Sequence, residues 1–191
     1  LYPRIWRDKS KEEVDAKILN KEEHTIRMRI PVDGEIIFED LVYGKINTKC
    51  SELDDFIIAR SDGSPTYNLT VVVDDSDMNI SHVIRGEDHI SNTPKQMLIY
   101  EALGWTMPKF GHLPMILGSD GKRLSKRHGA KGTSEYKNLG YLPDTLINYL
   151  ALLGWNPGND DEIFDFNYLQ ENFSLDKVNK KSAVFDTTML E

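Results

Sequence analysis

The spacing of apolar positions predicts strands and turns in the first third of the chain. TIRMRI, residues 25–30, alternates polar and apolar positions, as a half-buried strand does. VDGEIIF follows with a hairpin signal at Asp33 and Gly34, and LDDFIIAR is a further apolar run. Residues 11–19 are expected to form a helix. Residues 1–63 are therefore expected to form a meander packed on a helix.

Three short apolar runs in the middle of the chain predict strands. LTVVV at residues 69–73 and ISHVIRGED at residues 80–88 have the continuous apolar character of strands buried on both faces. HLPMIL at residues 112–117 is expected to be the third strand.

A helix is predicted between the second and third of these runs. SNTPKQMLIYEALGW offers Asn92 or Thr93 as N-cap, Pro94 at the first helical position and Gly104 as the stop. A strand, a helix and a strand imply a crossover unit of a parallel sheet. Ligands of such sheets bind at the carboxyl ends of the strands.

The last third of the chain, residues 131–191, is predicted to be mainly helical. LPDTLINYLALLGW has Pro143 at a helix start and Gly154 after its end. Residues 168–173 are expected to form another short helix. The apolar face predicted for the longer helix consists of Leu146, Ile147, Leu150 and Leu153.

Composition indicates a globular protein of the cytoplasm. The chain has 191 residues, a formal net charge of −8 and a pI of about 5.2, with 39% hydrophobic and 28% charged residues. This acidic balance argues against a protein that coats nucleic acid by bulk charge. No apolar run approaches the ~20 residues that span a bilayer, and LYPRIWRDKS does not resemble a signal peptide, so no membrane partner is expected.

The single cysteine, Cys50, excludes an internal disulfide framework and a Cys₄ or Cys₂His₂ zinc site within these residues. The five histidines are too scattered to suggest a metal site. Because the chain begins with leucine and stops without a tail-like composition, it is expected to be an excised piece of a longer protein.

A basic cluster stands out in this acidic chain. Six lysines and arginines lie between residues 122 and 137, against one acid, Glu135. A solvated charge run is one interpretation. Four glycines around the cluster favour another, because glycine lets the backbone come close to a ligand. Cations beside exposed amides suit a phosphate that gains charge as it reacts. The cations are Lys122, Arg123, Lys126, Arg127, Lys131 and Lys137.

Three segments together resemble the middle of a bacterial-type glutamyl-tRNA synthetase, a class I aminoacyl-tRNA synthetase. They are SDGSPTYNLTVVVDDSDMNISHVIRGEDHISNTPKQMLIYEALGW, HLPMILGSDGKRLSKRHGA and GYLPDTLINYLALLGW. RLSKR, residues 123–127, is similar to the KMSKS-type loop of that family. The resemblance implies an enzyme of protein biosynthesis, a ligase that attaches glutamate to tRNA(Glu) through a glutamyl-adenylate. ATP with Mg²⁺ would be used, and this chain would carry about half of the catalytic site and be inactive alone.

The resemblance also implies roles for the residues of the loop. Lys126 would contact an ATP phosphate, and Ser125 would donate a hydrogen bond or shape the loop. Arg127 would steer or hold the loop closed, although a solvated surface position is its alternative. Arg123 stands where the family pattern usually has its first lysine, so the charge is kept but a compact ammonium is replaced.

Two further residues are implied to bind the glutamate side chain. Arg85 follows an apolar strand, and its planar guanidinium matches a carboxylate that would otherwise be stranded. A structural salt bridge to Glu87 or Asp88 is the competing role. Tyr67 would add a hydroxyl from a tight turn, whereas packing is the ordinary role of a turn tyrosine.

Two weaker assignments concern ATP. Asp88 aligns with an acidic position near ATP, and Ile116 with an apolar position near adenine. Each has a structural alternative, because Asp88 could cap the next helix and Ile116 could fill the core.

The family layout implies an α/β fold built from three parts. Residues 1–63 would be the C-terminal part of an α+β insertion that binds the tRNA acceptor end. Residues 64–130 would be the second half of a Rossmann-type catalytic domain, and residues 131–191 the start of a helical stem-contact domain. The HIGH-type motif and the anticodon-binding region would lie outside this chain, and the parent is expected to be a monomer.

Two alternative functions stay open at this point. One is a tRNA-binding module without independent catalysis, which predicts salt-sensitive RNA binding only. The other is a truncated synthetase paralogue that glutamylates a modified tRNA base. An intact RLSKR followed by GYLPDTLINYLALLGW argues against the paralogue.

Overall fold

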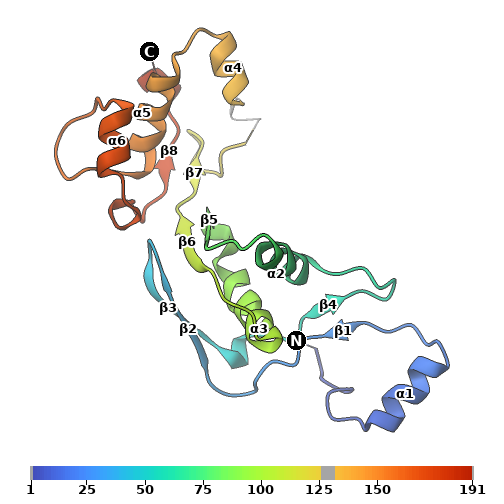
Figure 1. The fold of residues 1–191 in the computed structure, drawn as a ribbon. Coiled ribbons are helices and arrows are strands. Elements are labelled where there is room, and N and C mark those ends of the chain that lie inside the picture. The colour runs from blue at the N-terminus through green and yellow to red at the C-terminus, as the bar shows by residue number, and fades with distance from the viewer. Residues whose placement is uncertain (1, 126–131, 191) are drawn as a thin grey trace. The chain divides into compact units, whose positions relative to one another are not determined.

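The computed structural model describes residues 2–125 and 132–190, and its helices and short strands form an α/β arrangement (Figure 1). The chain divides into two compact units, each discontinuous in sequence. The first unit comprises residues 1–38, 45–83 and 91–109. The second comprises residues 39–44, 84–90 and 110–191.

The predicted N-terminal helix is confirmed as α1, Lys11–Leu19, but the predicted hairpin turn is wrong. Ser10 and Glu13 form a capping box at the start of α1. Strand β2, Glu35–Asp40, pairs with β3, Gly44–Lys49, through a turn at residues 41–43. Gly34, with φ +104°, lies at the open end of this hairpin, where its carbonyl accepts from Cys50 N–H at 3.0 Å.

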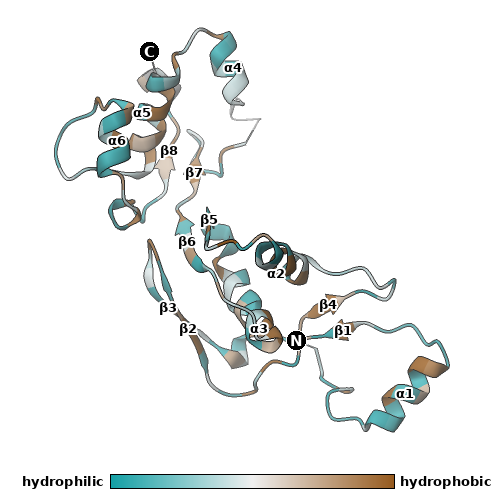
Figure 2. Cartoon of the chain, in the orientation of Figure 1, coloured by the Kyte–Doolittle hydropathy of each residue, from teal (hydrophilic) through white to brown (hydrophobic). Residues whose placement is uncertain are grey.

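The other early strands are shorter than the sequence predicts and pair with each other. β1, Ile26–Arg27, runs antiparallel to β4, Ile57–Ala59, and a 3₁₀ turn at Cys50–Glu52 precedes β4. Buried Asp55 anchors this region, because its carboxylate accepts from Arg7 at 2.7 Å and from the Ile30 backbone at 3.1 Å. Figure 2 shows β4 and part of the following helix at the hydrophobic end of the scale.

The strand predicted at residues 69–73 is wrong, because this run lies inside helix α2, Tyr67–Asp77. A short apolar run is compatible with either a strand or a helix, and only the flanking residues distinguish the two. Here Thr66 is the N-cap, and its hydroxyl donates to Ile57 at 2.8 Å. Val72 is buried, and Asn68 accepts a hydrogen bond of 3.1 Å from Gln96 of the next helix, against which α2 packs.

The predicted strand and helix that follow are confirmed. β5 spans His82–Gly86, a 3₁₀ turn spans Glu87–Asn92, and α3 spans Thr93–Leu103. Asn92 is the N-cap of α3, and Gly104 ends it with φ +67°. β6, Lys109–Leu113, is the hydrogen-bonded neighbour of β5.

The strand predicted at residues 112–117 is interrupted. Pro114 separates β6 from β7, Ile116–Leu117, because proline lacks the N–H that a continuous strand needs. β7 pairs in parallel with β8, Ala183–Val184.

The C-terminal part of the second unit is mainly helical, as predicted. It contains α4 at Thr133–Asn138, α5 at Pro143–Gly154, α6 at Phe166–Asn172, and 3₁₀ turns at Leu175–Lys177 and Thr187–Leu190. The buried face of α5 differs from the prediction, because Ile147 and Leu150 are 36% and 45% exposed whereas Tyr149 is buried. A hydrophobic core forms from Val42, Trp155, Phe164, Leu169 and Val178.

Candidate functional site

The carboxyl end of β5 carries a run of polar residues that the second unit holds in place. Glu87 accepts a hydrogen bond from the Tyr43 hydroxyl and one of 3.0 Å from the Met115 backbone. Burial raises the pKa of Tyr43, and its hydrogen bond to Glu87 raises it further. Position 86 is occupied by glycine, and a side chain there would collide with Asp88, since an added Cβ would lie 2.6 Å from Asp88 Oδ1. The backbone after β5 is thus fixed by packing and hydrogen bonds.

Asp88 forms an ion pair with Arg123, with Oδ2 and Nη1 2.9 Å apart. The pair joins a residue predicted near ATP to the first residue of RLSKR. Their side chains are 34% and 69% exposed, so the pair contributes little stability. Its consequence is geometric, because it connects the start of the RLSKR loop to the end of β5.

A tight turn positions the same loop. Leu124 N–H donates to Ile116 at 2.8 Å, and Gly118 N–H donates to Lys122 at 2.7 Å. Ser125 follows directly and is half-buried. Lys126 and Arg127, the other predicted catalytic residues of the loop, lie outside the described residues.

Arg85 occupies the end of β5 as predicted and contacts a buried pair of residues. Its Nε donates to Nε2 of His112 at 3.2 Å, and its guanidinium lies 5.8 Å from the Phe110 ring centroid. On the other side of the imidazole, Nδ1 lies 2.6 Å from Asp40 Oδ2. The two acids proposed as alternative partners of Arg85 have partners of their own, Glu87 in Tyr43 and Asp88 in Arg123.

Tyr67 lies in α2 and Ile116 in β7, near the two ends of the predicted catalytic segment, residues 64–130. Tyr67 is the first residue of α2 and is 50% exposed. Ile116 is 38% exposed and lines an apolar pocket of about 160 Å³ in the second unit, together with Leu150 and Phe173.

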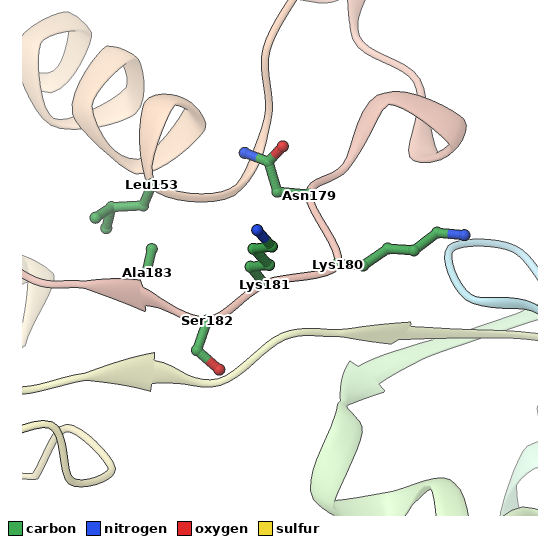
Figure 3. A pocket seen from close by; sticks show the side chains of 6 residues that line it. All are labelled: Leu153, Asn179, Lys180, Lys181, Ser182 and Ala183. Carbon is green, nitrogen blue, oxygen red and sulfur yellow. The ribbon is translucent and has the colours of Figure 1, made fainter.

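A second pocket, of about 520 Å³, lies at the C-terminal part of the second unit and carries lysines (Figure 3). Leu153 and Ala183 form its apolar side. Lys180 extends away from Leu153, and its Nζ lies 3.4 Å from the Tyr43 carbonyl oxygen. Lys181 is exposed, and Asn179 and Ser182 complete the lining.

The sequence of the chain matches a known protein family. Residues 2–191 match the family described as tRNA synthetases class I (E and Q), catalytic domain. The chain belongs to this class I tRNA synthetase family.

Curated relatives of this class I family support the assignment over most of the chain. The glutamate–tRNA ligase of Nitratidesulfovibrio vulgaris is 54% identical over 166 residues, which are 87% of this chain and 36% of the relative. That of Nitrosospira multiformis is 50% identical over 190 residues, 100% of this chain and 40% of the relative. The chain therefore spans about two-fifths of the length of these relatives.

Solved structures of the family share the fold. The glutamate-tRNA synthetase of Elizabethkingia anophelis superposes with a TM-score of 0.82 at 35% identity, covering 96% of this chain and 41% of that one. A glutamate tRNA ligase of Elizabethkingia meningosepticum, described as in complex with its amino acid, gives 0.83 at 35% identity, with 96% and 40% covered. The α/β class predicted from the sequence is thus confirmed.

Asp40 and His112 of this synthetase chain were not predicted from the sequence. The signal for Asp40 was present, because Ile36, Phe38 and Asp40 occupy the buried phase of β2. A carboxylate in that phase must find partners inside the fold. His112 stands at the start of an apolar run, where its partner could not be identified without the fold.

Neither a metal cluster nor a membrane span is found in the described part of this synthetase chain. Within residues 2–125 and 132–190 no three His, Cys, Asp or Glu side chains are grouped to hold a metal ion. No helix in the same ranges is long and apolar enough to cross a bilayer.

The buried histidine predicts a pH dependence of stability. Burial lowers the pKa of His112, and Arg85 and His89 add to this, whereas Asp40 opposes it. Below about pH 6.5 the unfolded chain therefore binds a proton that the folded chain does not, and stability falls by up to ~1.4 kcal/mol per pH unit. Urea unfolding at pH 7.5, 6.5 and 5.5 should show this slope. An unchanged slope in His112→Gln would contradict the assignment.

Proposed function

We propose that the chain is the central part of a glutamate–tRNA ligase, which activates glutamate with ATP and transfers it to tRNA(Glu). The main support for this proposal is the position of Arg85 at the end of β5, close in sequence to Asp88. The ion pair of Asp88 with Arg123 connects the RLSKR loop to the same strand end. Names and identities of the relatives support the substrate, and their lengths support a partial site.

In the proposed first step the α-carboxylate of glutamate attacks the α-phosphorus of ATP and pyrophosphate leaves. Negative charge grows on the departing oxygens, so positioned cations lower the barrier more than any covalent contribution does. Lys126, Arg123 and Arg127 are proposed as these cations, with Ser125 shaping the loop. Arg85 and Tyr67 are proposed to bind the glutamate side chain, and Asp88 and Ile116 to lie near ATP.

Mg²⁺ bound with ATP would neutralise phosphate charge. Mg²⁺ takes most of its ligands from water and substrate phosphates, so one or two protein carboxylates suffice. Asp88 is an oxygen donor of the required kind beside the loop. No dedicated metal site of this chain is proposed.

Lys126 should contribute strongly to the first step. In the complete ligase, meaning the full-length polypeptide that carries these residues, Lys126→Ala should lower kcat of glutamate-dependent pyrophosphate exchange about 100-fold. Lys122→Ala is the matched control, since Lys122 precedes RLSKR and is exposed. If both variants lost activity equally, the loop would act by charge alone and the role of Lys126 would be wrong.

The domain layout predicted from the sequence is kept as part of the proposal, with residues 1–63, 64–130 and 131–191 serving the acceptor end, catalysis and the tRNA stem. The lysine pocket supports the last of these. Lys180 and Lys181 are exposed cations beside Asn179 and Ser182, groups that also donate hydrogen bonds to phosphate.

Removing these lysines should weaken tRNA binding without changing glutamate activation. Lys180→Ala and Lys181→Ala should each reduce the slope of log K against log salt by about 0.7 to 0.9. Lys177→Ala is the control, because Lys177 lies in the adjacent 3₁₀ turn and does not line the pocket. Filter binding of tRNA(Glu) between low and moderate salt measures the slopes. If all three variants reduced the slope equally, the lysines would contribute only non-specific charge and the pocket would not be a tRNA contact.

Pyrophosphate exchange tests the proposed function directly. It is measured with glutamate, ATP, Mg²⁺ and tRNA(Glu), on the complete ligase and on this chain alone. We expect exchange by the complete ligase only, since the chain spans about two-fifths of its relatives. If the complete protein binds tRNA but does not exchange, the chain belongs to an RNA-binding protein and the ligase proposal fails.

A further inference from the structure

A chain of three hydrogen-bonded side chains ends at Arg85. Asp40 Oδ2 lies 2.6 Å from His112 Nδ1, and His112 Nε2 lies 3.2 Å from Arg85 Nε. The side chains of Asp40 and His112 are 0% exposed. All three residues belong to the second compact unit, to strands β2, β6 and β5.

The two oxygens of Asp40 have different partners. Oδ1 accepts from the backbone N–H groups of Val42 and Tyr43 at 2.9 Å each and of His112 at 3.2 Å. Oδ2 remains for the imidazole. Burial favours a raised pKa for Asp40, but the hydrogen bonds from Tyr43, His112 and Val42 outweigh it and lower the pKa. Asp40 is therefore a carboxylate, and a carboxylate can only accept hydrogen bonds.

The protonation of His112 follows from its neighbours. Because Asp40 accepts at Oδ2, the imidazole proton lies on Nδ1. Burial lowers the pKa of His112, so the ring is neutral and Nε2 is an acceptor. An arginine has no acceptor of its own, and its Nε–H matches this Nε2.

We propose that Asp40 and His112 are positioning residues for Arg85, which fix the plane of its guanidinium for the side-chain carboxylate of glutamate. The glutamate part rests on the proposed function, whereas the hydrogen-bond chain does not. The five N–H donors of arginine are coplanar, so a bond at Nε sets the direction of the Nη donors as well. A fixed fork selects a carboxylate by geometry rather than by charge alone.

The neutral imidazole has a further effect. If Asp40 contacted Arg85 directly, its charge would neutralise the guanidinium and compete with an incoming carboxylate. His112 accepts from Arg85 without supplying a negative charge at that distance. The bond at Nε thus orients Arg85 without placing an anion at that atom.

Asp40→Asn tests the proposal at one atom. The amide oxygen must replace Oδ1, because an NH₂ group there would face three backbone donors. The NH₂ group then faces His112 Nδ1, which must become an acceptor, so the proton moves to Nε2. Nε2–H would face Arg85 Nε–H, donor against donor, and Arg85 would lose its orientation.

The kinetic measurement is made on the complete ligase. We expect Asp40→Asn to raise KM for glutamate about 10- to 100-fold, as for a lost hydrogen bond to a charged group, with KM for ATP unchanged. His112→Gln offers one donor and one acceptor in place of the ring nitrogens and should stay close to the unsubstituted enzyme. Asp165→Asn, which removes the same charge at the N-cap of α6, is the control, since asparagine caps equally well.

An independent readout is the tautomer of His112, from two-bond ¹H–¹⁵N couplings in ¹⁵N-histidine-labelled protein. We expect a proton on Nδ1 in the unsubstituted enzyme and on Nε2 in Asp40→Asn. A proton on Nε2 without substitution, or equal changes of KM for glutamate and ATP, would overturn the proposal. Loss of exchange in the unsubstituted enzyme would instead refute the proposed function, and the tautomer would still decide the hydrogen-bond chain.

Discussion

Arg85→Ala should abolish glutamate activation in the complete ligase while ATP binding persists. The substitution would leave the glutamate carboxylate desolvated without its cation, a loss of about 3–5 kcal/mol, or roughly 100- to 5,000-fold in rate. Adenine and phosphates are proposed to contact other residues, so their binding should not change. Pyrophosphate exchange at saturating ATP, together with binding of a non-hydrolysable ATP analogue, measures the two effects separately.

Arg85→Lys is the matched variant for this experiment. Lysine keeps the charge but loses the planar fork and the Nε–H that His112 accepts. We expect activity between those of the unsubstituted enzyme and Arg85→Ala. Near-normal activation by Arg85→Ala would contradict the assignment of Arg85 to the glutamate site.

Trp155→Ala should cause the largest loss of stability in the second unit. Trp155 is 2% exposed and contacts Phe164 edge-on at 5.8 Å and Phe173 at 5.7 Å between ring centroids. Removing a buried tryptophan side chain costs about 3–5 kcal/mol. Hydrogen exchange of the α5 and α6 amides should report the loss, because residues of both helices pack in the same core as Trp155.

Two further variants separate packing from other causes. Trp155→Phe keeps much of the ring, and it removes an Nε1–H that has no hydrogen-bond partner among the described residues, so its cost should be much smaller. Trp105→Ala makes the same change at a tryptophan that is 36% exposed. Equal losses at Trp155 and Trp105 would show that burial is not the cause.

Local sequence signals predicted the elements whose ends have characteristic capping residues. α3 was predicted from Asn92, Pro94 and Gly104 because caps act within a few residues. The structure has Asn92 as the N-cap and Gly104 after the end, whereas Pro94 is the second helical residue and not the first. α2 was mistaken for a strand because a run of valines satisfies both structures. The contact of α2 with α3, which is long-range, decided the outcome.

The residues of the candidate site likewise divide into those with a local sequence signal and those that depend on a long-range contact. Arg85 could be proposed for the site because a charged residue near the end of an apolar strand is visible in the sequence, and the structure has it in β5. Asp40 and His112 were not found, since their importance depends on a contact between distant strands. The turn of the β2–β3 hairpin was misplaced because Asp33 and Gly34 match a turn motif that lies at the hairpin's other end.

The distance along the chain between Asp40 and His112 has a consequence for biosynthesis. The two residues are 72 positions apart. At typical rates of synthesis, Asp40 leaves the ribosome roughly 4 to 14 s before its partner. During this interval the carboxylate can remain hydrated only if the end of β2 stays open. The second unit should therefore close late, after β6 has emerged, and a chaperone that binds earlier would meet the end of β2 still open.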